Sequence, residues 1–249
     1  MAAPLPVGKV VLGAFLTPWW KRRAFLRSLA VPLAALAALT LAWYAMGEGL
    51  PVYAGWGVCL LYWLLVTSFA VRCHRLVLLE RQPEAMEWKL EWSRRDTMFF
   101  LWSGAVWFIY GAVWLAGVTL SLNVAVNIWQ AARGPGEVFE WLSLACKLPA
   151  LYVFARLCLA LPAIAVDGDP GLKSAWRLTR GNGWRLMIVV GVLPWAISEV
   201  VSLLYRGDAT AIETGALTVL GIALFAVEIA ALSISYRELT GGGEPQGAA

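Results

Sequence analysis

Long apolar runs, separated by short polar segments rich in charges and turn residues, dominate the pattern of this chain. A helix that crosses a bilayer needs about 20 consecutive, mostly apolar residues. The runs that reach this length predict membrane-spanning helices at residues 26–46, 50–71, 98–122, 138–166, 184–204 and 212–236. The sequence therefore predicts an all-α, polytopic integral membrane bundle of about six transmembrane helices, in a single domain over residues 1–240. The Gly-rich segment 241–249 is expected to be a disordered tail.

The fourth apolar run, 138–166, is too long for one straight helix across a membrane. Three arrangements accommodate it. Its outer end around Glu140 and Lys147 projects from the bilayer, or Pro149 kinks the helix, or the run ends in a bent segment near Pro162. The apolar pattern is compatible with all three.

Composition supports the membrane class. Hydrophobic residues make up 60% of the 249 residues and charged residues only 14%, and the mean hydropathy is +0.69. A water-soluble domain carries far more charge than this. With six spans and short loops, the chain has no room for a separate soluble catalytic domain.

The distribution of basic residues predicts the orientation of the bundle. Most of the 20 Lys and Arg residues fall before the first span, between spans two and three, between spans four and five, or after span six. The positive-inside rule therefore places both termini in the cytoplasm. The formal net charge of +4 indicates attraction to anionic phospholipids, not a nucleic-acid footprint.

Charged side chains inside the apolar runs are the strongest functional clue. An unpaired charge at the centre of a spanning helix costs roughly 2.5 to 3.5 kcal/mol, so such groups usually face a partner or a watery cavity. Depth in the membrane predicts two intramembrane pairs, Lys147 with Glu199 in the outer half and Arg156 with Glu228 in the inner half. At about 100° per residue, Lys147 and Arg156 emerge from nearly opposite faces of their helix. The favoured interpretation is that these pairs hold the bundle together, and the alternative is a conduit for an ion, a proton or a polar headgroup.

The segment between spans four and five predicts an amphipathic helix on the inner leaflet. Asp169 and Pro170 are typical of a helix start, and residues 181–183 (Gly-Asn-Gly) of a helix end. A basic stripe and flanking tryptophans would contact acidic phospholipid headgroups, through Lys173, Trp176, Arg177, Arg180, Trp184 and Arg185. The N-terminal run 7–20 is a second candidate surface element.

No metal or cofactor site is indicated. The cysteines lack CxxC spacing, and the single histidine, His74, lies beside Cys73 without a second histidine or an acidic cluster. We expect His74 to be a polar residue at the cytoplasmic interface.

Two stretches of sequence resemble a known group of proteins. Residues 159–168 (LALPAIAVDG) and 175–186 (AWRLTRGNGWRL) are similar to a signature of uncharacterised bacterial multi-pass inner-membrane proteins, and residues 72–80 show a weaker likeness. That family is similar to the membrane domain attached to some glycerophosphodiester phosphodiesterases. The resemblance implies a bacterial inner-membrane bundle, near lipid metabolism. It carries over no catalytic residues, because the phosphodiesterase chemistry requires histidines and clustered carboxylates that a chain with one histidine does not provide.

The sequence favours a non-catalytic function. We expect a scaffold or accessory subunit of a membrane assembly, whose partners are anionic lipids and other membrane subunits. The alternative is a carrier or conduit for a lipid or small polar solute that uses the buried charges. An intramembrane enzyme is disfavoured, since no nucleophile–base or paired-Asp arrangement is evident. A polar cavity that reaches Glu199 or Glu228 would favour the carrier, whereas dry ion pairs would favour the scaffold.

Overall fold

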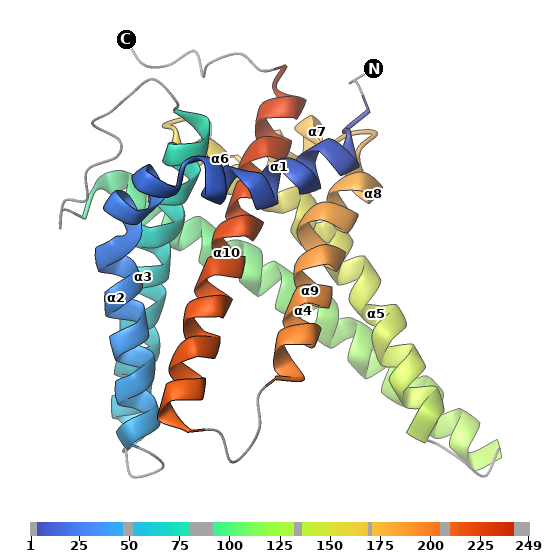
Figure 1. Cartoon of the computed structure of the whole chain (residues 1–249). Coiled ribbons are helices and arrows are strands. Elements are labelled where there is room, and N and C mark those ends of the chain that lie inside the picture. The colour runs from blue at the N-terminus through green and yellow to red at the C-terminus, as the bar shows by residue number, and fades with distance from the viewer. Residues whose placement is uncertain are drawn as a thin grey trace.

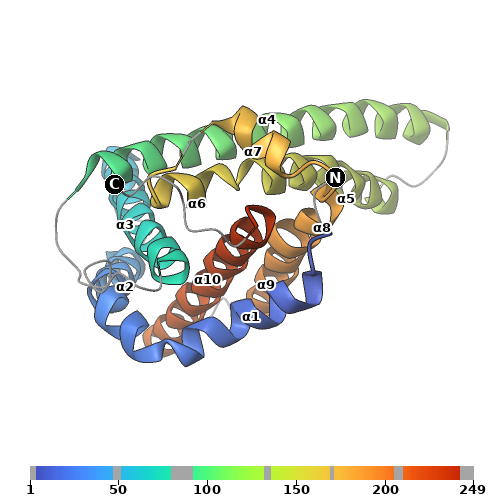
Figure 2. The same ribbon diagram turned by 90° about the horizontal axis from the view of Figure 1, so that it is seen from above.

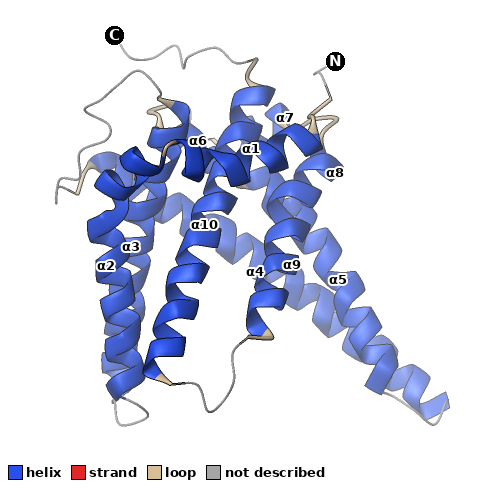
Figure 3. Cartoon of the chain, viewed as in Figure 1, coloured by secondary structure: helices blue, strands red, loops and turns tan. Residues whose placement is uncertain are grey.

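The computed structural model describes residues 4–46, 52–79, 92–131, 136–168, 171–204 and 210–241, and every regular element in these ranges is helical (Figure 3). The elements in chain order are α1 Val7–Trp20, α2 Arg22–Met46, α3 Val52–Leu78, α4 Arg94–Ala131, α5 Gly136–Leu157, α6 Ala160–Ala165, α7 Leu172–Leu178, α8 Gly183–Leu186, the π-helix η3 Met187–Val192, α9 Leu193–Ser202 and α10 Ala211–Leu239. Beyond Gly241, the tail expected at 241–249 lies outside the described residues.

The described residues contain five helical stretches that are long and apolar enough to cross a membrane: Tyr53–Leu78, Arg94–Val124, Ala145–Ala165, Gly183–Ser202 and Gly215–Leu239. The all-α, multi-pass membrane class predicted from the sequence is thus confirmed. The first predicted span coincides with α2, a helix of 25 residues, of which the apolar part found is the shorter stretch Ala30–Ala42.

The helices form a bundle around α10. Seen from above, α10 lies in the middle, with α2 and α3 on one side of it and α9 on the other (Figure 2). The long helices α4 and α5 run side by side along one edge, and α1 lies along the opposite edge. Buried apolar residues from α1, α3, α5 and α10 belong to one connected core.

Helix α1 crosses the end of the bundle where α10 finishes (Figure 1). At Gly13 the two helices approach so closely that an added Cβ would lie 3.2 Å from the Ile234 side chain. Lys9 Nζ forms an ion pair of 2.9 Å with Glu238 Oε1, and the backbone N–H of Leu5 donates to Asn182 Oδ1 at 2.8 Å. The run 7–20 expected to be a surface element is therefore a helix that is attached to both α10 and the turn before α8.

The fourth apolar run is broken near its end. Helix α5 finishes at Leu157, a turn follows at residues 158–159, and α6 contains Pro162. Pro149 remains inside α5. Of the three arrangements considered for this run, the bent segment near Pro162 is present.

The fifth span is assembled from α8, η3 and α9. The π-helical turn at Met187–Val192 directly precedes Pro194, which lies at the start of α9. Proline has no N–H to donate to the preceding turn, and π-bulges form where the regular hydrogen-bond ladder is interrupted. The widened turn includes Gly191, where an added Cβ would lie 3.3 Å from Leu151 Cβ of α5.

Gly117 marks a close approach between α4 and α5, and we expect Gly117→Ala to lower the free energy of unfolding by about 1–3 kcal/mol. Its added Cβ would lie 2.9 Å from Cys146 Cβ, an atom fixed to the α5 backbone that cannot swing aside. Gly104→Ala is the matched control on α4, because its Cβ would meet Trp63 at an ordinary 3.6 Å. Unfolding by SDS in mixed micelles compares the two variants. Equal stability of the two would contradict close packing at Gly117.

Candidate functional site

A cavity of about 330 Å³ lies inside the bundle between α3, α4, α5, α9 and α10. This volume is within the range of sites that hold small molecules. The lining residues are Trp63, Val66, Thr67, Ala70, His74, Phe99, Ser103, Trp107, Tyr110, Leu151, Phe154, Cys158, Leu161, Val190, Gly191, Pro194, Trp195, Ser198, Phe225, Glu228, Ile229 and Leu232. The widened turn at η3 contributes Val190 and Gly191, so the π-helix is part of the cavity wall.

Aromatic rings make up much of this wall. The rings of Trp107 and Phe154 pack with their centroids 5.0 Å apart, and Tyr110 lies 5.3 Å from the same Phe154 ring. These contacts join α4 to α5 on one side of the cavity. Trp107 of α4 thus belongs both to this aromatic cluster and to the cavity wall.

Two buried polar residues on one face of α3 line the cavity. Thr67 and His74 are seven residues apart, which is close to two helical turns, and each is only 1% exposed. The Thr67 hydroxyl has no hydrogen-bond partner. A buried hydroxyl without a partner costs free energy, and the Thr67 oxygen itself is covered, so it does not lie on the cavity surface.

His74 joins α3 to α10 in the interior. Its Nδ1 lies 2.7 Å from Ser233 Oγ, and the Ser233 hydroxyl donates to the carbonyl of Ile229 at 2.8 Å. The Ser233 side chain thus links the imidazole of α3 to the backbone of α10. His74, expected to be a polar residue at the cytoplasmic interface, is buried between α3 and α10.

Glu228 is the acidic residue of the cavity. The structure shows no ion pair or hydrogen bond of its carboxylate with any described residue. A second cavity of about 180 Å³ lies between α9 and α10 and is lined by Ser198 and Glu228 as well. Glu228 therefore lines both cavities.

The predicted pair of Arg156 and Glu228 is not present. Arg156 Nε donates to Thr179 Oγ1 at 2.7 Å, and Nη2 donates to the carbonyl of Trp176 at 2.6 Å. The guanidinium also stacks 3.6 Å from the Trp176 ring centre. Arg156 thus turns toward α7 and away from the cavity, because α7 offers both acceptors and an aromatic face.

The second predicted pair is Lys147 with Glu199, and both residues contact the indole of Trp195. Trp195 Nε1 donates to Glu199 Oε1 at 2.8 Å, and Lys147 Nζ lies 5.6 Å from the Trp195 ring centre. The structure brings both residues to Trp195 without a direct ion pair between them. A cation over the ring face and a carboxylate at the ring N–H are the favourable positions for the two charges.

The residues expected to contact headgroups gather around α7 and α8, and all six are exposed: Lys173, Trp176, Arg177, Arg180, Trp184 and Arg185. Gly181 has the left-handed φ of +84° and ends the turn after α7, as the Gly-Asn-Gly segment predicted. The start of α7 differs from the prediction, since its N-cap is Gly171 and residues 169–170 lie outside the described part of the chain.

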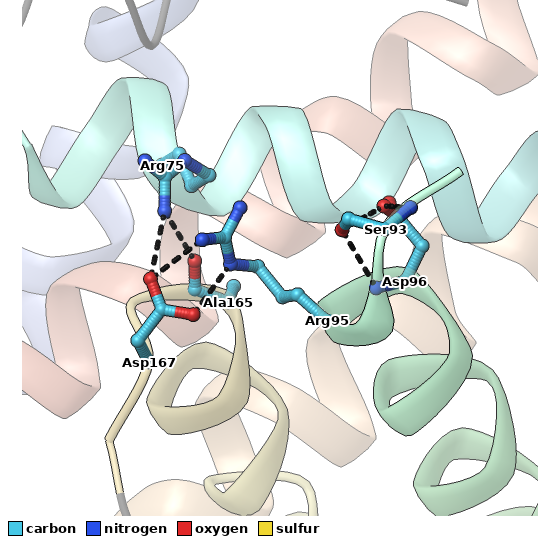
Figure 4. A network of polar contacts seen from close by, with 6 residues as sticks. All are labelled: Arg75, Ser93, Arg95, Asp96, Ala165 and Asp167. Atoms are coloured by element: carbon cyan, nitrogen blue, oxygen red, sulfur yellow. Dashed lines mark hydrogen bonds and ion pairs between the residues drawn. The ribbon is translucent and has the colours of Figure 1, made fainter. Parts of the chain in front are cut away.

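A polar network at the same end of the bundle has no counterpart among the residues singled out from the sequence (Figure 4). Asp167 accepts from Arg95 Nε at 2.8 Å and from Arg95 Nη2 at 2.6 Å. Arg75 Nη1 donates to the carbonyl of Ala165 at 3.1 Å and lies 3.5 Å from Asp167 Oδ2. The network joins α3, α4 and the turn after α6, where Asp167 adopts a left-handed φ of 61°. A signal in the sequence is the Asp-Gly pair at 167–168, which is typical of such a turn.

No protein-family model matches the chain, and neither curated proteins nor solved structures provide a significant match. The site is interpreted from its own geometry.

Proposed function

We propose that this protein binds a small amphiphilic molecule in the central cavity and acts as a carrier or conduit for it. One observation carries the proposal: the Glu228 carboxylate has no ion pair or hydrogen bond with a described residue, and Glu228 lines an aromatic-lined cavity of about 330 Å³. Buried polar groups are nearly always satisfied in proteins. A ligand with a polar end and an apolar body would satisfy this carboxylate and fill the remaining space.

A scaffold or accessory function, the first expectation from the sequence, is the second candidate. Large apolar side chains point outward along α3 and α4, including Tyr53, Trp56 and Phe108, which are 78%, 73% and 77% exposed. Such a surface suits lipid tails and also suits another membrane subunit. This function makes no use of the cavity, so the two candidates predict different co-purifying molecules.

For the membrane arrangement, we propose six spans with α2 as the first, both termini in the cytoplasm, and location in a bacterial inner membrane. Helices α1 and α7 lie at the same end of the bundle as the end of α10 (Figure 1). In this arrangement they rest on the inner leaflet, where Lys173, Arg177 and Arg180 contact anionic headgroups. The resemblance of residues 159–186 to bacterial inner-membrane proteins supports the same location. The proposal includes no catalytic step.

The test is to identify what leaves the membrane with the protein. We expect native mass spectrometry of the chain, purified in mild detergent, to show a retained small molecule at near-stoichiometric occupancy. Ser103→Phe, which places a ring in the cavity, should reduce that occupancy by at least about tenfold, a loss of roughly 1.4 kcal/mol in binding. Ser103→Ala is the control, because the Ser103 hydroxyl bonds only its own helix, at the carbonyl of Phe100. A stoichiometric protein partner and no retained small molecule would overturn the carrier in favour of the scaffold.

A further inference from the structure

We propose that the ligand of the central cavity is a hydrophobic organic cation, and that Glu228 is its counter-charge. This inference rests on the proposed ligand-binding function and names its ligand class. The chemistry meant is a positively charged nitrogen or phosphorus centre attached to an apolar body, as in quaternary ammonium compounds, hydrophobic amines and choline or ethanolamine headgroups.

The charge of the lining is the first argument. Glu228 is the one carboxylate among the described residues that line the cavity, and no Lys or Arg is among them. The cavity therefore presents one carboxylate and no Lys or Arg side chain among its described lining residues, which favours a cation and disfavours an anion.

The basic residues expected nearby do not provide a positive counter-charge for the Glu228 carboxylate. Arg156, the basic residue expected to pair with Glu228, is held by Thr179 and the Trp176 carbonyl. Lys147 lies against the Trp195 ring, beside Glu199. A carboxylate at this depth without a partner is costly, and a ligand cation is the group that would offset that cost.

The aromatic wall is the second argument. Trp63, Trp107, Trp195 and Tyr110 all line the same cavity as Glu228. Ring faces attract cations, more strongly when water is excluded. Aromatic rings in the wall of a cavity that also holds one carboxylate suit alkylated ammonium groups, whose charge is large in radius and weakly hydrated.

The third argument is access. Ser198 and Glu228 line both the central cavity and the smaller cavity between α9 and α10. Glu228 therefore lies in the wall of both cavities, and a residue shared by two cavities fits a carrier better than a permanently bound structural lipid.

The experiment compares two probes of the same shape and opposite charge, tetraphenylphosphonium and tetraphenylborate. Binding of each labelled ion is measured by equilibrium dialysis on the full chain in nanodiscs of phosphatidylglycerol. We expect saturable tetraphenylphosphonium binding that Glu228→Gln weakens by at least about tenfold, which is about 1.4 kcal/mol. Glu199→Gln is the matched control, an intramembrane carboxylate outside the cavity, and should change binding less than about twofold. Glu228→Asp keeps the charge and should retain part of the tetraphenylphosphonium binding. Retained binding in this variant would show that the loss in Glu228→Gln does not come from misfolding.

The outcomes distinguish the cation inference from the ligand-binding function on which it rests. Unchanged tetraphenylphosphonium binding in Glu228→Gln, or preferred binding of tetraphenylborate, overturns the cation inference. If Ser103→Phe then abolishes binding of either probe, the ligand-binding function stands without the charge preference. If neither probe binds saturably and no molecule co-purifies, both proposals fail. When cation binding is confirmed, adding phosphatidylcholine to the nanodiscs distinguishes the sources: competition indicates a lipid headgroup, and its absence indicates a free cation.

Discussion

Arg156→Ala is expected to lower the free energy of unfolding by about 2–4 kcal/mol, the largest effect expected of a single exchange at the C-terminal end of α5. The residue is 7% exposed and joins α5 to α7 through Thr179 Oγ1 and the Trp176 carbonyl. Hydrogen bonds from a charged donor contribute about 1.5–3 kcal/mol each, and the stacked Trp176 ring adds to them. Removal of the guanidinium also removes its desolvation cost, so the net effect is smaller than the sum.

The measurement for Arg156 is hydrogen exchange read by mass spectrometry, together with SDS unfolding. We expect faster exchange in α7 while α10 is unchanged, because α7 has only seven residues and depends on its contacts. Arg156→Lys should fall between wild type and Arg156→Ala, since an ammonium keeps the charge but cannot reproduce the planar fork. An Arg156→Ala protein as stable as wild type, with α7 still protected, would contradict this role.

His74→Ala is the second large effect, an expected loss of about 2–4 kcal/mol. The exchange opens space beside Phe99, whose ring centre lies 5.6 Å from the imidazole, and removes the 2.7 Å bond to Ser233. A double-mutant cycle with Ser233→Ala isolates the bond itself. We expect a coupling energy of about 1–2 kcal/mol, because both groups are fully buried.

Thr67→Val is the control for His74 on the same face of α3. It removes a hydroxyl that has no partner, so the stability of the ligand-free protein should stay equal or rise. Additivity of His74→Ala and Ser233→Ala would show that the two side chains do not interact. A fall in stability for Thr67→Val in the absence of ligand would show that the hydroxyl is satisfied.

The bundle could be predicted from the sequence because apolar length is a local property. The spans that became α3, α4, α5 with α6, α9 and α10 were all visible as runs of apolar residues, and Pro162 correctly suggested a bend. A π-helix could not be predicted in the same way. It depends on the missing donor of Pro194 and on the packing of Gly191 against Leu151 together.

The prediction of two intramembrane ion pairs failed because depth along a span was its only basis. Depth along a span gives the height of a side chain, whereas its direction depends on which helix lies beside it. The two cations of α5 contact different helices, since Lys147 reaches Trp195 of α9 and Arg156 reaches Trp176 of α7. The partners were wrong because aromatic rings and a backbone carbonyl, not carboxylates, receive the two cations.

The cavity could not be predicted from the sequence because it belongs to no single helix. Its polar lining residues come from three helices and meet only after the bundle has formed: Thr67 and His74 of α3, Ser103 of α4 and Glu228 of α10. The spacing of Thr67 and His74 placed both on one face of α3, and that was the available signal. The burial of that face depends on α10, which no local pattern reveals.

The most direct measurement of the central claim is an electron cryo-microscopy map of the full chain in lipid nanodiscs, at a resolution that shows side chains. We predict non-protein density between α3, α4 and α10, in contact with the Glu228 carboxylate. A map in which side chains close this space, with Glu228 paired to a basic residue of the same chain, would contradict it.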